Sequence, residues 1–369
     1  MEMHLHEQSD RPLEAFAAEI EALQKRILAD VGEEDARYIR RIVALRGRTE
    51  LAGRSLLFVG WLPPAWVAGV GLLSLSKILD NMEIGHNVLH GQYDWMKDPR
   101  LAADTYEWDW ACPAAHWRHS HNFVHHTFTN IVGKDRDVGY GVLRMSDEQR
   151  WNPLNVAQPF YALLQMVLFE WAVAMHDVEL NLVLTGKRSP RDALEKFVLV
   201  ARKTTRQSLK DYVTFPLLAG PGAPAVFFGN LSANLIRNVW AFLVIFCGHF
   251  PEGVQMYTIA ETEDETPAQW YLRQVLGSAN IDGPRWFHIL SGHLSHQIEH
   301  HLFPDMPSSR YAEVAPQVEA ICHKYGVPYN RAPFRRQVAT FTRRILRGAL
   351  PLPRRKKTRP AERPVPAFA

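Results

Sequence analysis

Long apolar segments alternate with charged ones along this chain. Residues 56–78 form the first apolar run, and its first charged side chain is Lys77. About 20 apolar residues suffice to cross a bilayer, so this run is long enough. Pro63 and Pro64 lie within it, however, and prolines interrupt helices. The pattern therefore predicts either one transmembrane helix or a short hairpin that dips into one leaflet.

The strongest apolar pattern comes later, as two legs at residues 212–228 and 231–250. A Gly-Asn pair at 229–230 separates the legs, and a Gly-Pro-Gly sequence at 220–222 disturbs the first leg. Arg237 lies within the second leg, where contact with lipid is costly. We therefore expect a second hairpin in which Arg237 faces protein.

The remaining segments predict surface helices and polar loops. Residues 12–50 alternate charge with Leu, Ile and Ala at helical spacing, which is typical of an amphipathic helix. Residues 156–175 are apolar but contain Glu170, so we expect an interfacial or half-buried helix there. A helical tail follows at about 310–325, and the residues from about 351 are typical of a disordered segment.

These elements predict an all-α membrane protein. No run alternates as a strand does, and no internal repeat is evident. An even number of crossings places both termini and all three histidine-rich polar segments on one side. We expect residues 1–54 to form an N-terminal amphipathic segment, residues 55–310 a membrane-embedded domain, and residues 311–369 a C-terminal helix with a basic, disordered tail.

Charge and cysteine content narrow the class of protein. The net charge of the 369 residues is +3, which is too small to indicate nucleic-acid binding. Six arginines between residues 37 and 54 and four basic residues at 354–357 flank the apolar segments. By the positive-inside rule, such flanks are cytoplasmic. Three scattered cysteines support neither a disulfide framework nor a zinc ribbon, and the polar N-terminus lacks the apolar core of a cleavable signal peptide.

Histidines carry the strongest chemical signal. Ten of the 17 fall in three short clusters, at residues 86–90, 116–126 and 296–301. Residues four apart share one face of a helix, and three histidine pairs have this spacing: His86 with His90, His121 with His125, and His296 with His300. Neutral imidazole is the commonest metal ligand in proteins. The sequence therefore predicts a metal centre to which three helices contribute.

The spacing also excludes several familiar metal sites. The His-Glu-x-x-His string of a zinc protease does not occur in the sequence. A carboxylate di-iron bundle needs two Glu-x-x-His motifs, and Glu83 to His86 supplies the only one we find. A structural zinc site is complete with four ligands, whereas the clusters offer about twice that number. Two metals held by nitrogen beside a membrane favour iron that activates dioxygen against an apolar substrate.

The three clusters resemble the histidine boxes of the membrane-bound fatty-acid desaturases. The matching strings are His-Asn-Val-Leu-His at 86–90, His-Asn-Phe-Val-His-His at 121–126 and Gln-Ile-Glu-His-His at 297–301. The third string is similar to that of front-end, acyl-lipid-type enzymes and their bacterial relatives. The resemblance implies four transmembrane helices in two hairpins, under a cytosolic cap that holds two iron ions.

The resemblance also implies a set of iron ligands. Carried over residue by residue, they are His86, His90, His121, His125, His126, His300 and His301, with His249 added after the second hairpin. Two positions depart from the family pattern, because Ile245 stands where many relatives have asparagine and Gln297 where others have histidine. Ligand strength favours His296 over Gln297, whereas the resemblance favours Gln297. We expect Gln297 near the metal and His296 behind it.

Other polar residues near the boxes are candidates for supporting roles. Metal-bound imidazoles need hydrogen-bond partners that fix their orientation. Candidates for this role, or for alternative ligands, are His116, His119, His293, His296, Asp135 and Asp137. We expect His176 to be a satisfied interfacial histidine. Surface or packing roles are expected for His4, His6, His288 and His323.

The implied reaction is the oxygen-dependent insertion of a cis double bond into a long acyl chain, carried as acyl-CoA or acyl-lipid. The sequence has no haem-domain signature, no GxGxxG fingerprint and no four-cysteine spacing, so a separate ferredoxin or cytochrome with its reductase must supply electrons. Arg100, Arg118 and Lys134 are candidates for docking an acidic carrier. A hydroxylase of the same di-iron class is the alternative activity, and a non-catalytic metal-binding membrane protein is the second alternative.

Overall fold

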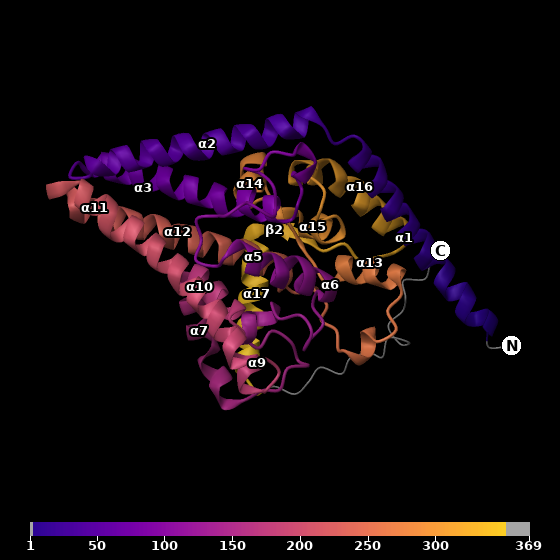
Figure 1. Cartoon of the computed structure of the whole chain (residues 1–369). Helices are drawn as coiled ribbons and strands as arrows, with labels where there is room; N and C mark the ends of the chain where they lie inside the picture. Colours follow the sequence, from indigo (N-terminus) through magenta and orange to yellow (C-terminus); the bar gives the residue numbers. More distant parts are fainter. Residues whose placement is uncertain (1–2, 352–369) are drawn as a thin grey trace.

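Two helical arms project from a cap of shorter helices in the computed structural model of the chain (Figure 1). The structure describes residues 3–351, with side chains from residue 11 onward. The arms are hairpins whose tips meet at the left of the view. Within the described residues the only strands are β1 (Asn280–Asp282) and β2 (Arg331–Pro333), which pair in parallel. The prediction of a predominantly helical protein is confirmed.

The first arm is a hairpin of α2 (Glu33–Phe58) and α3 (Pro63–Ile78). Pro63 begins α3, at a position where a missing amide proton costs nothing. α2 passes residue 54 without a break, so the amphipathic segment and the first hairpin share one helix. Gly53 lets the two helices approach closely, since a Cβ there would lie 2.7 Å from the backbone nitrogen of Leu73. Of the two forms left open by the sequence, the structure has the hairpin.

The second arm has a continuous first leg made of α10 (Pro190–Leu209), η6 (Lys210–Thr214) and α11 (Phe215–Leu218). η7 (Gly220–Gly222) then turns the chain into α12 (Ala223–His249). The predicted break at residues 229–230 is wrong, because α12 runs straight through it. A Cβ at Gly229 would lie 2.5 Å from a Leu57 methyl, and the Asn230 amide donates to the carbonyl oxygen of Asp211 at 2.5 Å. Contacts with the rest of the fold therefore keep both residues helical.

Buried charges join the two arms and the cap. The Lys77 ammonium donates to Asp211 at 2.8 Å, and Arg54 donates to the same carboxylate at 3.2 Å. Arg237 of α12 is 1% exposed and pairs with Glu170 at 2.5 Å. The prediction that Arg237 faces protein is therefore confirmed.

Among the described residues, one helical segment is long and apolar enough to cross a membrane by itself. It is Gly220–His249. A second segment, made of Pro153–Val167 and Phe169–Leu184, passes the same test only as a pair bent by 99°. That bend lies within the helix expected to be interfacial or half-buried. The structure thus supports a helical protein with one or two candidate spans, and it does not establish four.

The cap holds the histidine boxes on short helices at its centre. These helices are η1 (Leu79–His86), α4 (Asn87–Leu89), α5 (Ala114–Trp117), η3 (Arg118–His125), α6 (His126–Phe128), η9 (Leu294–His296) and α15 (Gln297–Leu302). Helices packed around them are α1 (Met3–Ala29), α7 (Gln158–Val167), α8 (Phe169–Asp177), α9 (Leu180–Leu184), α13 (Pro267–Leu276), α14 (Arg285–Leu290) and α16 (Tyr311–Lys324). Short 3₁₀ turns complete it: η2 (Asp94–Met96), η4 (Val138–Gly141), η5 (Pro153–Ala157), η8 (Ala260–Thr262) and η10 (Ser308–Arg310).

The C-terminal part of the cap contains one helix more than the sequence pattern predicted. α16 matches the expected helical tail, but α17 (Phe334–Ala349) follows it and packs against α12 and α7. The two short strands are a further departure from the expectation of no strand. The basic residues at 354–357 and the expected disordered tail from residue 352 lie outside the described residues.

Candidate metal centre

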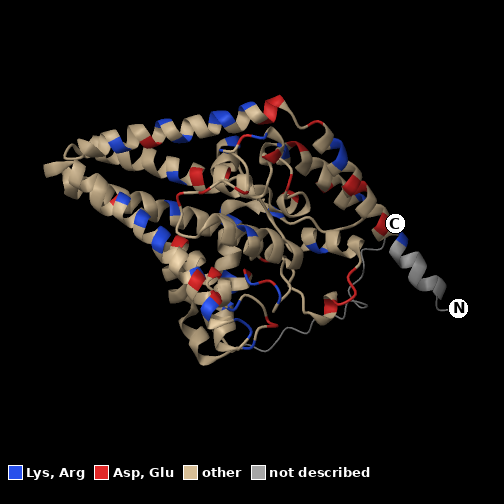
Figure 2. Ribbon diagram, viewed as in Figure 1, with Lys and Arg blue, Asp and Glu red and all other residues tan. Residues whose placement is uncertain are grey.

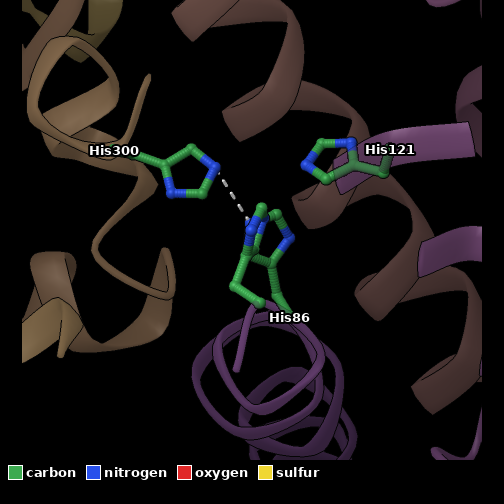
Figure 3. Close-up of side chains that lie close together, drawn as sticks. His86, His121 and His300 are labelled. Atoms are coloured by element: carbon green, nitrogen blue, oxygen red, sulfur yellow. Dashed lines mark hydrogen bonds between the residues drawn. The ribbon is translucent and has the colours of Figure 1, made fainter. Parts of the chain in front are cut away.

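The three histidine boxes converge at the centre of the cap. Figure 3 shows His86, His121 and His300 pointing towards one another from separate segments. Ring nitrogens of His86, His90, His121 and His300, here called the first cluster, lie within 4.8 Å of one another. The second cluster, which consists of His125, His249 and His301, meets the same limit. The fold thus gathers seven of the sequence-predicted ligands into two groups.

Distances within the clusters fit metal coordination. In the first cluster, Nε2 of His86 lies 3.2 Å from Nε2 of His300. In the second, Nε2 of His249 lies 3.0 Å from that of His125 and 3.2 Å from that of His301. Metal–imidazole bonds of about 2.1 Å place two ligands at right angles about 3 Å apart. The clusters could therefore hold a cation without a change in the spacing of these nitrogens.

Several buried polar atoms at the centre lack a hydrogen-bond partner among the described residues. They are Nε2 of His90 and of His121, both ring nitrogens of His126, Nδ1 of His300 and Oε1 of Gln297. Such atoms are costly and rare in native proteins. His126 lies between the clusters, with its ring centroid 4.7 Å from that of His90 and 4.6 Å from that of His301. A bound cation accounts for this concentration of unpaired nitrogens.

The first two boxes lie where the helix widens. η1 and η3 are π-helices, and they end at His86 and His125. Single π-turns of this kind are frequent at functional sites. The rings of His121 and His125 are nearly parallel, with planes 25° apart and centroids 5.1 Å apart, although they serve different clusters. The spacing of four residues therefore brings the rings together in a π-helical turn, which the sequence pattern does not distinguish from an α-helical one.

Asp135 fixes the ring of His125. Both carboxylate oxygens lie 3.1 Å from Nδ1 of His125, and they also accept from the backbone amides of Asn130 at 2.7 Å and Asp137 at 2.9 Å. Because Nδ1 is engaged, Nε2 faces the second cluster. The Asp137 carboxylate lies 3.6 Å from Nδ1 of His121. Both carboxylates singled out in the sequence therefore contact cluster histidines, and the Asp137 carboxylate also lies within 4.8 Å of ring nitrogens of both His121 and His125.

His249 and His301 are oriented by groups that the sequence analysis missed. Nδ1 of His249 donates to the carbonyl oxygen of Ile245 at 2.8 Å, so the backbone orients this ring despite the apolar side chain. Nδ1 of His301 lies 3.2 Å from both Oγ1 of Thr129 and Oε1 of Gln274. Thr129 could have been found from the sequence, because it belongs to the His-Thr-Phe-Thr string that ends the second box. Gln274 could not have been found in this way, because it lies on α13, away from every histidine box.

Burial keeps most of these imidazoles neutral. Desolvation, reinforced by neighbouring imidazoles, holds the pKa values of His90 and His300 well below the ordinary value. Desolvation also lowers the pKa of His121 to about 4. Burial opposes protonation of His125 too, but the Asp135 carboxylate raises the pKa of that ring. Neutral imidazole is the form that binds a cation, so the site suits a metal at neutral pH.

Gln297, rather than His296, faces the centre. Its amide nitrogen lies 3.4 Å from Nε2 of His249. The His296 ring stacks on His288, with centroids 4.5 Å apart, and is not part of either cluster. Gly248 makes room for the amide, since a Cβ at Gly248 would lie 2.8 Å from Oε1 of Gln297. The arrangement agrees with the one expected from the sequence, which nevertheless gave no role to Gly248.

Three other candidate ligands lie outside the two clusters. Nδ1 of His116 lies 3.1 Å from Asp177, and His119 is exposed and stacks on Phe123. His293 faces Glu83 at 3.0 Å. The Glu83 carboxylate also accepts from the Tyr38 hydroxyl at 2.7 Å, so the lone Glu-x-x-His motif supports packing of the first arm. These histidines are engaged elsewhere.

The histidines expected to be bystanders also lie apart from the clusters. His176 lies 3.5 Å from Asp137, His288 contacts Ser295 at 2.7 Å, and His323 is exposed. The side chains of His4 and His6 lie outside the part of the chain whose side chains are described.

A largely apolar cavity opens beside the two histidine clusters. Its wall combines cluster histidines with Trp110, Trp117, Val173 and Phe250. Trp110 and Trp117 belong to this wall, and Trp108 packs behind both of them. A wall of this kind suits a chain of methylenes.

Comparison with known proteins places these features in context. The model of the family described as fatty acid desaturase matches residues 59–333. The chain is 43% identical over 347 residues to the NADPH-dependent stearoyl-CoA 9-desaturase of Mycobacterium tuberculosis, an overlap that covers 93% of this chain and 81% of that protein. It is 26% identical over 324 residues to the sn-1 linoleoyl-lipid 6-desaturase of Synechocystis sp., with 81% and 88% covered. Human fatty acid desaturase 3 is 26% identical over 290 residues, with 76% and 60% covered.

Proposed function

The chain belongs to the fatty acid desaturase family, and from this premise we propose that it inserts a cis double bond at carbon 9 of a saturated long-chain acyl-CoA. The observation that carries the proposal is the pair of histidine clusters beside an apolar cavity. An acyl-CoA is favoured over an acyl-lipid because the 43% identical relative is named for stearoyl-CoA, whereas the relative named for a lipid substrate is 26% identical.

The proposed cofactor is a pair of iron ions, one in each cluster. The proposed ligands are His86, His90, His121 and His300 for one ion and His125, His249 and His301 for the other, with His126 between them and Gln297 beside His249. Bound iron supplies the dioxygen chemistry that side chains lack.

The protein itself contributes orientation and a dry site. Asp135 and the Ile245 carbonyl hold two rings of the second cluster with Nε2 turned inward. Trp110, Trp117 and Val173 offer an apolar wall along which an acyl chain can lie. Because two adjacent methylenes must face the same point in turn, the fit of the chain to this wall sets the position of the new double bond.

Electrons and membrane attachment complete the proposal. Desaturation with O2 consumes two electrons from outside, and we assign them to a separate ferredoxin or cytochrome with its reductase, which draws on NADPH as in the name of the M. tuberculosis relative. Of the basic residues proposed for docking, Arg100 is exposed, whereas Arg118 donates to the carbonyl of Ala103. We further propose that the two arms embed in the membrane from the cytoplasmic side, where the histidine boxes lie.

Product analysis tests this function directly. The full-length chain is expressed in a host that makes saturated acyl chains and has a compatible reductase, and cellular fatty acids are analysed by gas chromatography and mass spectrometry. Wild type and His323→Ala should yield a new cis-9 monounsaturated chain, and His300→Ala should yield none. Hydroxy fatty acids without a new double bond would assign the chain to the hydroxylase reaction instead.

A further inference from the structure

The three histidine boxes differ in how far they lie from solvent. Every residue of η1, which carries the start of the first box, is buried, and so is every residue of α15, which carries the third. In η3, by contrast, only His121 and His125 are buried, whereas His119 and Phe123 are exposed. η3 runs between the labels α5 and α6 at the centre of Figure 1. At this point a single helix, about 10 Å across, separates the clusters from solvent.

The outer face of η3 presents an aromatic pair. The ring of His119 stacks on that of Phe123, with centroids 5.8 Å apart and planes 20° apart, and Phe123 is 60% exposed. Residues four apart share one face of a helix, and residues two apart do not. Phe123 therefore projects outward between the inward-facing His121 and His125. Aromatic side chains are enriched where proteins bind one another, so this face is suited to contact with a partner.

Two cations flank the aromatic pair. Arg118 begins η3, and the Lys134 ammonium lies 5.3 Å from the ring centroid of Phe128, at the end of the same helical stretch. Arg118 donates to a backbone carbonyl, which is neutral, and neither cation forms an ion pair with a carboxylate among the described residues. Arg100 differs, because Asp98 pairs with it at 2.8 Å. The charges of Arg118 and Lys134 are therefore available to an acidic partner.

The tips of the two arms offer no such charge. Residues 55–76 and 212–236 contain no Asp, Glu, Lys or Arg. Figure 2 shows the joined tips free of charged residues, whereas the cap carries charges of both signs. An acidic protein therefore finds its counter-charges on the cap and not at the tips.

We propose that the outer face of η3, formed by Arg118, His119, Phe123 and Lys134, is the surface on which a small acidic one-electron carrier protein docks. The inference rests on the proposed function, which requires electrons from outside, and adds the place at which they enter. Electron transfer slows steeply with distance, and contact at Phe123 leaves about one helix diameter of protein between the carrier and the clusters. Electron-transfer interfaces are small and transient, so the limited extent of this face fits such a partner.

The carrier balances the proposed reaction. Each new double bond breaks two C–H bonds of the acyl chain and reduces one O2 to two waters. Two carrier molecules supply one electron each, and solvent supplies two protons. These protons and the two hydrogens lost by the acyl chain are the four hydrogens of the waters. Because two docking events are needed for each product, a weak and rapidly reversible interface is suited to turnover.

Charge reversal at Lys134 and truncation of Phe123 test the surface. Full-length Lys134→Glu and Phe123→Ala are compared with wild type and with Lys25→Glu, which reverses the charge of an exposed lysine on α1. The probe is a plant-type ferredoxin with ferredoxin–NADP+ reductase and NADPH. Binding of oxidised ferredoxin to each purified protein is measured by titration calorimetry at low and high salt. In parallel, each protein is reduced anaerobically with dithionite, without ferredoxin, and mixed with O2 and stearoyl-CoA, and the product of this single turnover is measured.

Both variants should bind ferredoxin about tenfold more weakly or worse, and their ferredoxin-driven turnover at low ferredoxin concentration should fall accordingly. Binding to wild type should weaken as salt rises. The single-turnover yield after dithionite should equal that of wild type, because that route needs no docking. Lys25→Glu should match wild type in every measurement.

Each other outcome contradicts a different statement. Unchanged ferredoxin binding in both variants, or no binding to wild type, would overturn the docking surface and leave desaturation standing. A single-turnover yield that falls as far as the ferredoxin-driven rate would show damage to the site and overturn the docking role. A raised KM for stearoyl-CoA with unchanged ferredoxin binding would assign this face to the substrate. No product from dithionite-reduced wild type would refute the proposed function, and the calorimetry would still decide the docking surface.

Discussion

At the scale of single residues, the rings of the second cluster are held on their far sides by three kinds of acceptor. His125 has the Asp135 carboxylate, His249 the Ile245 carbonyl, and His301 the neutral oxygens of Thr129 and Gln274. A carboxylate partner raises the basicity of an imidazole ligand more than a neutral oxygen does. His125 is therefore the most strongly polarised nitrogen of its cluster.

Replacing Asp135 with asparagine should lower turnover about 10–100-fold, as for other partners that orient a metal ligand. The amide keeps the shape of the side chain but loses the charge that acts on His125. Turnover and iron content of the purified variant are the measurements. Asp137→Asn is the comparison and should cost less, because Asp137 lies further from its histidine. Wild-type turnover and iron content in Asp135→Asn would contradict this role.

Gln297→Ala should reduce both iron content and turnover, whereas His296→Ala should leave iron content near wild type. The reason is geometric, because the Gln297 amide adjoins His249 while His296 stacks on His288. Gly248→Ala should reproduce the Gln297→Ala defect, since its Cβ would displace the amide. Iron retained in Gln297→Ala and lost in His296→Ala would reverse the assignment.

At the scale of elements, local sequence pattern predicted the helices but not the contacts that decide where they end. α16 matches the helical tail expected at about residues 310–325, and the hairpin of the first arm is one of the two forms that Pro63 and Pro64 left open. The break at residues 229–230 was predicted from Gly and Asn, whose helical state depends on Leu57 and Asp211 of other elements. α17 was missed because basic residues alternate with its apolar ones in the sequence. Its apolar face is recognisable only from its packing against α12 and α7.

An ion pair ties α2 to the cap, and its contribution should depend on pH. Arg310 donates to Asp35 at 2.8 Å, and although burial opposes ionisation, the guanidinium lowers the pKa of Asp35. Asp35→Asn should therefore destabilise the fold by about 1–3 kcal/mol at pH 7. Because the pKa is lower in the folded state than the unfolded value of about 3.9, the contribution is complete above pH 4 and is lost as the pH falls through the folded value.

Denaturant unfolding of wild type and Asp35→Asn at pH 7 and at progressively lower pH checks this linkage. The difference between the two proteins should shrink only below about pH 4. A difference that stays constant down to the lowest pH would show that Asp35 acts through packing and not through its charge.

At the scale of the whole molecule, the sequence predicted which residues form the site better than it predicted how they are divided between the two clusters. The histidine boxes are local strings, so the candidate ligands were visible without a fold. The assignment of each histidine to a cluster could not be predicted from the strings. His300 and His301 are adjacent in the chain yet belong to different clusters, and His121 and His125, four residues apart, are also assigned to different clusters. Gln274 and Gly248 reach the site from α13 and α12, and only the folded chain brings them there.

Metal analysis of the purified full-length protein tests the two-cluster centre most directly. We predict about two iron ions per chain, because each cluster offers enough imidazole nitrogen for one ion. His90→Ala and His249→Ala, which each remove one ring from a different cluster, should each lower the iron content. One zinc ion per chain, or an iron content unchanged in both variants, would contradict a di-iron centre built from these two clusters.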